Sequence, residues 1–196
     1  MTAGLPRRHA TCDGLDMPRA RRRVYPGIAY HATNRGVERR RLFRNASDYW
    51  HFLRLLKKGK ARHPVSVFAL CLMPNHFHAL VRPAEERALS AYFHWVLGCY
   101  SRHLRTCTHT SGAGHVFQQR FWTGPIEDDR HFLSVARYIE RNPLKAKLVK
   151  KAERWPWSSL RLRQTGGLDL LDPAPVALPS DWVAQVNDEP FAEDPD

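Results

Sequence analysis

One short strand-like run that follows a Pro-Asn turn constrains this chain more than any other segment. The run begins His76-Phe77-His78, and mainly apolar residues continue it to Val81. Alternate side chains of a strand share one face, so His76 and His78 are expected to point the same way and Phe77 the opposite way. Two neighbouring imidazoles are half of a metal site, because imidazole is a common metal ligand but two ligands hold an ion weakly. Any metal site therefore needs further ligands from another part of the chain.

The segment from Arg137 to Pro143 supplies such candidates. Apolar residues at helical spacing precede it and predict a helix over residues 128–139. Tyr138 and Asn142 are four positions apart, so a continuous helix places them on one face. Asn142 offers an amide oxygen to a divalent cation, and Tyr138 offers a phenolic oxygen as a nucleophile. An asparagine before a proline is also a common helix stop, so a bend or an end of the helix at this point is the alternative.

Charge is distributed unevenly along the chain. The 196 residues include 31 Lys and Arg and 19 Asp and Glu, for a formal net charge of +12 at pH 7. Arg163 is the last basic residue, and eight acidic residues follow it. Residues 1–163 therefore combine all 31 basic residues with 11 acidic ones, a balance of +20, while the remainder carries −8. A body this basic predicts a polyanionic partner, because the charge exceeds what solubility alone requires.

Length and composition predict one domain with two flanking segments. Residues 1–22 are basic and poor in apolar side chains, so we expect them to be disordered. Residues 23–163 are expected to form the domain, and residues 164–196 an acidic tail rich in Gly and Pro that we hypothesise folds over the basic surface. We find no secretory signal or membrane span, and the four cysteines form no Cys-x-x-Cys pair, so we expect a cytoplasmic protein with reduced thiols.

The spacing of apolar residues predicts strands over residues 28–33, 65–72, 76–81 and 116–122, and helices over residues 88–104, 128–139 and 144–151. A further helix, capped by Asn45 or Ser47, carries an apolar stripe as far as Leu56. The resulting order, β-α-β-β-α-β-α, fits a four-stranded antiparallel sheet with helices packed on one face. This is an α+β sandwich of the ferredoxin-like type, which can place the histidine strand centrally with the tyrosine helix across it. One more helical turn is expected around residues 181–186.

Several blocks of this sequence resemble one family of DNA-processing enzymes. His76-Phe77-His78 resembles the histidine–hydrophobic–histidine signature of HUH nucleases. The wider pattern resembles the IS200-like single-tyrosine transposases and, within them, the REP-associated tyrosine transposases. A lone His-x-His pattern is weak evidence, whereas five blocks in the family's order with the Tyr-to-Asn spacing kept are strong evidence. The blocks, which lie within residues 24–161, are Tyr30–Gly36, Met73–His78, Gly114–Phe121, Tyr138–Pro143 and Trp157–Ser159, with Phe117 in place of the more usual tryptophan.

The resemblance implies the HUH endonuclease fold and the metal-dependent cleavage and transfer of DNA strands. Tyr138 would be the catalytic nucleophile, forming a covalent 5′-phosphotyrosine and leaving a free 3′-hydroxyl. His76, His78 and Asn142 would hold a divalent metal, either Mg²⁺ or Mn²⁺, of which Mn²⁺ tolerates imidazole better. The partner would be single-stranded or hairpin DNA, and either a monomer or a homodimer is compatible with the sequence. The candidate DNA-binding residues are Asn34, Arg35, Arg120, Arg137, Arg141 and Lys145.

Two functions from different classes stay open at this point. One is a metal-dependent DNA endonuclease and transposase, and the other is a non-catalytic nucleic-acid-binding protein of the same fold. The intact set of two histidines, tyrosine and asparagine favours the enzyme, because a protein freed from catalysis has no physical need for all four. A hydrolase of small phosphoesters is disfavoured by the basic charge and by the lack of a carboxylate-rich segment. A turn at Asn34 and Arg35 is an alternative to a DNA contact. His31 is expected to pack on the sheet, with a functional role as the alternative.

Overall fold

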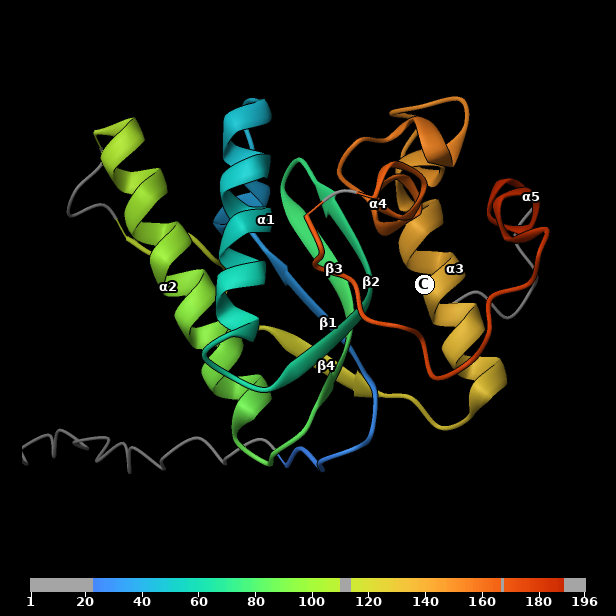
Figure 1. The fold of residues 1–196 in the computed structure, drawn as a ribbon. Helices are drawn as coiled ribbons and strands as arrows, with labels where there is room; N and C mark the ends of the chain where they lie inside the picture. Colours follow the sequence, from blue (N-terminus) through green and yellow to red (C-terminus); the bar gives the residue numbers. More distant parts are fainter. Residues whose placement is uncertain (1–22, 110–113, 167, 189–196) are drawn as a thin grey trace, which may run out of the picture.

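The computed structural model describes residues 23–109, 114–166 and 168–188 (Figure 1). The expected N-terminal extension, residues 1–22, lies outside this range. The strands are β1 (Tyr30–Arg35), β2 (Val65–Met73), β3 (His76–Pro83) and β4 (Trp122–Pro125). The helices are α1 (Ala46–Lys60), α2 (Ala88–Thr108), α3 (Asp129–Lys145), α4 (Ser159–Thr165) and α5 (Trp182–Asn187), with short 3-10 turns η1 (Val37–Arg39) and η2 (Ala152–Arg154).

The four strands form one antiparallel sheet in the order β2-β3-β1-β4. This order and the sequence of elements confirm the predicted α+β class with a ferredoxin-like arrangement. The turn at Pro74 and Asn75 joins β2 to β3, so that the histidine strand lies between β2 and β1. The strand that carries the histidines is therefore central, as predicted, and β4 is an edge strand.

Helices cover both faces of the sheet, so the expectation of a single covered face is wrong (Figure 1). One face packs against α1 and α2, and the other packs against α3, with α5 lying on α3. The reason is visible in β2, whose side chains are buried on both sides along nearly the whole strand. A near-continuous apolar run is typical of a strand covered on both faces.

The two sides of β3 differ as the alternation of side chains predicts. Phe77 and Ala79 pack into the core beneath α1 and α2, whereas Leu80 belongs to the core beneath α3. His76 and His78 have the same parity as Leu80 and therefore face α3. The prediction that the histidines point opposite to Phe77 is confirmed.

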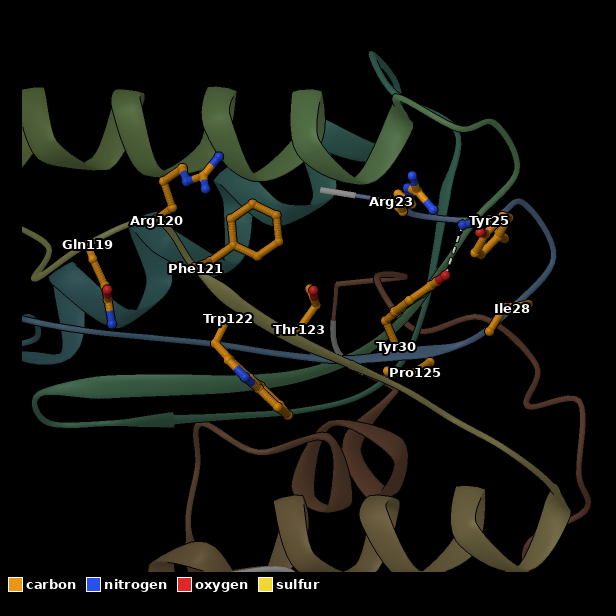
Figure 2. Close-up of a pocket in the computed structure, with 10 residues that line it drawn as sticks. All are labelled: Arg23, Tyr25, Ile28, Tyr30, Gln119, Arg120, Phe121, Trp122, Thr123 and Pro125. Carbon is orange, nitrogen blue, oxygen red and sulfur yellow. Dashed lines mark hydrogen bonds between the residues drawn. The ribbon is translucent and has the colours of Figure 1, made fainter. Parts of the chain in front are cut away.

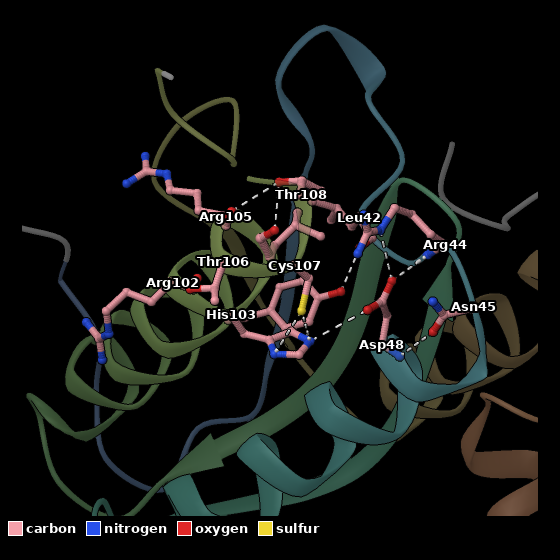
Figure 3. Close-up of polar contacts among 12 residues, drawn as sticks. Leu42, Arg44, Asn45, Asp48, Arg102, His103, Arg105, Thr106, Cys107 and Thr108 are labelled. Carbon is pink, nitrogen blue, oxygen red and sulfur yellow. Dashed lines mark hydrogen bonds and ion pairs between the residues drawn. The ribbon is translucent and has the colours of Figure 1, made fainter. Parts of the chain in front are cut away.

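A polar cluster fixes the start of α1 against α2 (Figure 3). Asn45, rather than Ser47, caps α1, because its side chain accepts the backbone N–H of Asp48 at 3.1 Å. The buried Asp48 carboxylate accepts the backbone N–H of Arg44 at 2.9 Å and lies 3.6 Å from His103 Nε2 on α2. These contacts connect the two helices that cover the sheet face opposite the histidines.

The predicted strand over residues 116–122 is wrong in its position, since β4 begins only at Trp122. Residues 114–121 form bends, with one isolated bridge between Phe117 and Gly36. Val116, Phe117 and Phe121 are buried in the core beneath α1 and α2. Their apolar side chains produced a strand-like pattern, although burial in an irregular segment accounts for them equally well.

The tyrosine helix is longer than predicted, because α3 continues through Pro143 to Lys145. Asn142 therefore lies inside the helix, and its carbonyl accepts the N–H of Ala146 at 2.9 Å. The alternative of a helix stop at Asn142 is excluded. The predicted separate helix over residues 144–151 is absent from the described residues, where a turn and then η2 follow α3.

The described part of the acidic C-terminal segment packs against the domain. The predicted turn around residues 181–186 is confirmed as α5, and Trp182 Nε1 donates to the buried Glu140 Oε2 at 2.7 Å. Asp172 pairs with Lys60 at 2.5 Å. These contacts hold residues 168–188 against α3 and the β2 side of the sheet, and residues 189–196 lie outside the described range.

Within the described residues, we find no helix with the length and apolar character needed to cross a membrane.

A serine in α4 provides a test of the packing behind α3. Ser159 is fully buried, and its Oγ accepts the N–H of Leu70 at 3.0 Å and donates to Glu140. We expect Ser159→Ala to lower the free energy of unfolding by about 2–3 kcal/mol, because it leaves a buried N–H unpaired and weakens the contacts of a buried carboxylate. Urea denaturation measures the change. Ser47→Ala, at an exposed position of α1, is the control and should change stability by less than about 0.5 kcal/mol; an equal loss in both variants would contradict the assignment.

Candidate active site

The two histidines of β3 form the centre of the candidate site. Their ring centroids are 5.0 Å apart, and His78 is only 7% exposed while His76 is partly exposed. Each ring has a partner at Nδ1: His76 Nδ1 lies 2.7 Å from Asn75 Oδ1, and His78 Nδ1 lies 2.9 Å from His31 Nε2. The Asn75 oxygen accepts, so His76 carries its proton on Nδ1 and keeps the Nε2 lone pair for another ligand. His78 does the same in the tautomer in which its Nδ1 donates to His31.

His31, on β1, was expected to pack on the sheet, with a functional role as the alternative, and the structure brings it into contact with His78. Its ring stacks on His78 with centroids 5.1 Å apart and lies 6.0 Å from the ring of Tyr138. In the antiparallel pairing of β1 with β3, Thr33 lies opposite His78, and His31 shares the face of Thr33. Alternation along β1 was the available signal, but it requires knowing which strand pairs with the histidine strand.

Burial keeps these imidazoles neutral near pH 7. It lowers the pKa of His31 and of His76 to about 4, with smaller contributions from the charges of His131 and Arg35 respectively. Burial, followed by the neighbouring His31 ring, holds the pKa of His78 well below its ordinary value. A neutral imidazole is the form that ligates a metal, because the ligand must present a lone pair.

Helix α3 lies across this face of the sheet and brings Tyr138 to the histidines. The Tyr138 ring centroid is 5.5 Å from that of His78, and Lys145 Nζ is 5.6 Å from the centre of the Tyr138 ring. The apolar stripe of α3 holds the helix there, as shown by Phe132, whose ring centroid is 5.5 Å from that of Phe68 on β2. Amphipathic packing therefore positions the phenol beside the imidazoles.

Asn142 lies on α3 one helical turn after Tyr138. It is 8% exposed, and its Nδ2 donates to the carbonyl of Tyr138 at 2.9 Å. The amide nitrogen is therefore directed at the helix backbone, which leaves Oδ1 as the group with acceptor capacity.

The donor set fits a divalent cation in an open site. Two neutral imidazoles, of His76 and His78, and one amide oxygen, of Asn142, leave coordination positions for a substrate oxygen. Among the described residues, no group of three or more His, Cys, Asp or Glu side chains is placed to hold a metal. The nearest further histidine, His31, uses its Nε2 on His78. His31 is therefore a partner of the candidate ligand His78 and is not counted as a metal ligand itself. The protein offers few ligands to the metal.

Three of the six predicted DNA-binding residues lie near the site or along the adjoining sheet edge. Arg35 is exposed and pairs directly with His76 across the β1–β3 ladder. Lys145 is exposed beside Tyr138. Arg120 is exposed just before the edge strand β4. Arg35 and Lys145 give the rim of the site a positive charge, whereas Arg120 points to the same side of the sheet as Phe121, away from Trp122 (Figure 2).

The structure does not bring the other three to the site. Asn34 is 6% exposed on the opposite sheet face, where its Nδ2 donates to the Gln119 carbonyl at 3.1 Å. Arg137 and Arg141 face α5: Arg137 Nε donates to the Gln185 carbonyl at 2.6 Å, and Arg141 donates to the Val186 carbonyl at 2.9 Å. Their contacts are structural, and a DNA contact by any of the three stays a prediction without geometric support.

The depressed histidine pKa values predict an acid-sensitive fold. Below the ordinary value of 6.5 and above about 4, the unfolded chain binds protons on His31 and His76 that the native state does not bind. Stability should therefore fall as pH falls through this window, by up to about 1.4 kcal/mol per pH unit for each histidine. Urea denaturation with a chelator present, repeated across the pH range, measures this slope. His31→Gln should make the slope shallower, and a slope that His31→Gln leaves unchanged would contradict the assignment.

Comparison with known proteins agrees with this geometry. Residues 24–142 match the family described as IS200-like transposases. The chain is 27% identical over 122 residues to a provisionally assigned REP-associated tyrosine transposase of Haemophilus influenzae, covering 58% of this chain and 69% of the relative. It is 26% identical over 132 residues to the REP-associated tyrosine transposase of Escherichia coli K12, covering 67% of this chain and 70% of the relative.

A solved structure supports the same fold. The structure of a REP-associated tyrosine transposase bound to a REP hairpin superposes with a TM-score of 0.59 and 23% sequence identity, covering 84% of this chain and 96% of the other. At this identity the likeness establishes the α+β fold. The family match covers more than half of the sequence and includes both histidines, the tyrosine and the asparagine. The chain therefore belongs to the family of IS200-like transposases, and named REP-associated tyrosine transposases are among its relatives.

Proposed function

We propose that this protein cleaves single-stranded DNA beside a hairpin repeat through a metal-dependent, covalent 5′-phosphotyrosine intermediate, and that the cleaved strand can be rejoined. The observation that carries the proposal is the 5.5 Å separation between the rings of Tyr138 and His78, with Asn142 on the same face of α3. Hairpin DNA as the partner is supported by the relative whose structure holds a REP hairpin. The basic body of the chain complements such a polyanion.

The reaction transfers a phosphoryl group from the 3′ oxygen of the DNA to the Tyr138 oxygen, so that one phosphoester replaces another. The Tyr138 phenol loses its proton as its oxygen attacks phosphorus, the bond between phosphorus and the 3′ oxygen breaks, and the leaving oxygen takes up a proton to become a free 3′-hydroxyl. When bound, a divalent cation supplies the Lewis acid that polarises a non-bridging oxygen of the phosphate. Because one ester replaces another, the 3′-hydroxyl of the same or another strand can attack the phosphotyrosine and reverse the step.

The residues around Tyr138 orient the phosphate and stabilise the negative charge that develops on the phenol oxygen and the phosphate. Lys145 places its ammonium 5.6 Å from the centre of the Tyr138 ring, where it attracts the charge that develops on the phenol oxygen and the phosphate. Arg35 would contact the same phosphate from the sheet side, a role that its exposure next to His76 supports. His31 holds the His78 ring through Nδ1 and so directs His78 Nε2 toward the ligand position.

A covalent adduct is the direct test of the nucleophile. Labelled single-stranded hairpin DNA from repeats of the source genome is incubated with the protein and Mn²⁺, and the products are separated on a denaturing protein gel. We expect label to migrate with the wild-type protein and to disappear in Tyr138→Phe, because the phenol oxygen forms the bond. Tyr49→Phe, on α1, keeps the ring that stacks on Phe43 and Trp157 and should retain the adduct. DNA binding without an adduct in wild type, across several repeats, would favour the non-catalytic alternative.

The role of His31 is tested by metal affinity instead of activity. His31→Leu removes the partner of His78 Nδ1, whereas His31→Gln can still offer an acceptor oxygen at a similar reach. We expect His31→Leu to weaken Mn²⁺ binding by about 10- to 100-fold, the range for second-layer partners of metal-binding histidines, and His31→Gln to stay within a few-fold of wild type. Isothermal titration calorimetry gives both constants. Equal affinities for the leucine variant and wild type would remove the positioning role.

A further inference from the structure

An open groove runs along the edge strand β4, close to the candidate active site (Figure 2). Its volume is about 580 Å³. Tyr25 and Ile28 lie on one side of it and are 57% and 38% exposed. Phe121 and Thr123 from the β4 edge line it as well, and Arg120 supplies a guanidinium. The groove therefore combines exposed aromatic surface with positive charge at the open edge of the sheet.

Trp122 connects this groove to the catalytic face. In the β1–β4 ladder Trp122 lies opposite Thr33, and directly opposed residues share a sheet face, so the indole is on the side of His78 and α3. Figure 2 shows it pointing to the side of the sheet opposite Phe121. The centroids of the Trp122 and His31 rings are 5.6 Å apart in an edge-to-face arrangement, and the His31 ring in turn contacts Tyr138. Trp122 is thus two ring contacts away from the proposed nucleophile.

The indole of Trp122 is held in place although it is 55% exposed. It lies over Gly124, where an added Cβ would be only 2.5 Å from the indole carbons. Only a glycine at this position allows the ring to rest on the backbone of β4. The result is an aromatic face that is fixed on one side and open to solvent on the other, which is the form of a stacking surface.

We propose that Trp122 is the stacking platform for an unpaired base next to the scissile phosphate, and that the DNA strand continues over the β4 edge into the groove beside Tyr25 and Arg120. This inference rests on the proposed function, because the position of Trp122 is defined relative to Tyr138. An unpaired base presents a free π-face to the indole, whereas the bases of a duplex are already stacked on their neighbours. The guanidinium of Arg120 suits the phosphate that follows such a base.

The test measures DNA affinity in the cleavage-silent Tyr138→Phe background, in the presence of a chelator. Affinity is measured first for an intact single-stranded oligonucleotide. It is then measured for a series of oligonucleotides in which one base at a time is replaced by an abasic site. We expect Trp122→Ala to weaken binding of the intact strand by about 5- to 150-fold, the equivalent of one lost base–aromatic stack. Trp122→Phe should retain most of the affinity. Trp50→Ala, at a tryptophan that is 42% exposed on α1, is the matched control and should bind like the parent.

The abasic series separates stacking from a general loss of structure. In the Tyr138→Phe parent, one abasic position should weaken binding far more than the others. In the Trp122→Ala double variant that same substitution should have almost no further effect, because the base has already lost its partner. Equal affinity in the Trp122→Ala and Trp50→Ala variants, or the same abasic profile with and without Trp122, would overturn the platform. A Tyr138-dependent adduct that persists in Trp122→Ala with unchanged affinity would overturn it while leaving the proposed function intact.

Discussion

The antiparallel register between β1 and β3 is the constraint on which the rest of the site depends. It sets Arg35 opposite His76 and Thr33 opposite His78, and the Thr33 hydroxyl donates to the Phe77 carbonyl at 2.7 Å. A slip of one residue would turn both histidines into the core beneath α1 and α2 and bring Phe77 to the catalytic face. Phe77 resists such a slip, because it is fully buried. A single apolar side chain behind the strand therefore fixes the two imidazoles in front of it.

Helix α3 packs against the sheet with one face and against α5 with another. This arrangement explains which of the predicted residues reach the site. Tyr138 and Asn142 are four apart and face the sheet, whereas Arg137 and Arg141 are also four apart but face α5. Closeness to Tyr138 in sequence made both arginines candidates for DNA, although a position one residue away is rotated by about 100° on a helix. Glu140 on the α5 side is fully buried and accepts from Trp182. The helix is thus held from behind, while its other face brings Tyr138 to His78.

The predictions that succeeded rest on local periodicity, and those that failed depend on distant contacts. Alternation in His76-Phe77-His78 and helical spacing before Tyr138 determine side-chain faces within one element, so both were predictable. The strand over residues 116–122 failed because burial beneath α1 and α2 imitates a strand pattern in an irregular segment. The partnership of His31 with His78 joins residues 47 positions apart and depends on which strands are neighbours. No window of sequence contains that information.

The charges of the site are divided between its rim and its interior. Arg35 and Lys145 at the rim are exposed, where water stabilises their charge and leaves it able to attract a polyanion. His76 and His78 are held neutral by burial, with Arg35 adding to the effect at His76. A protonated pair there would have no lone pair for a metal and would repel it. In the proposed mechanism, the burial that makes the histidine pair costly to protonate suits it to ligate a metal, and the exposed cations attract the DNA.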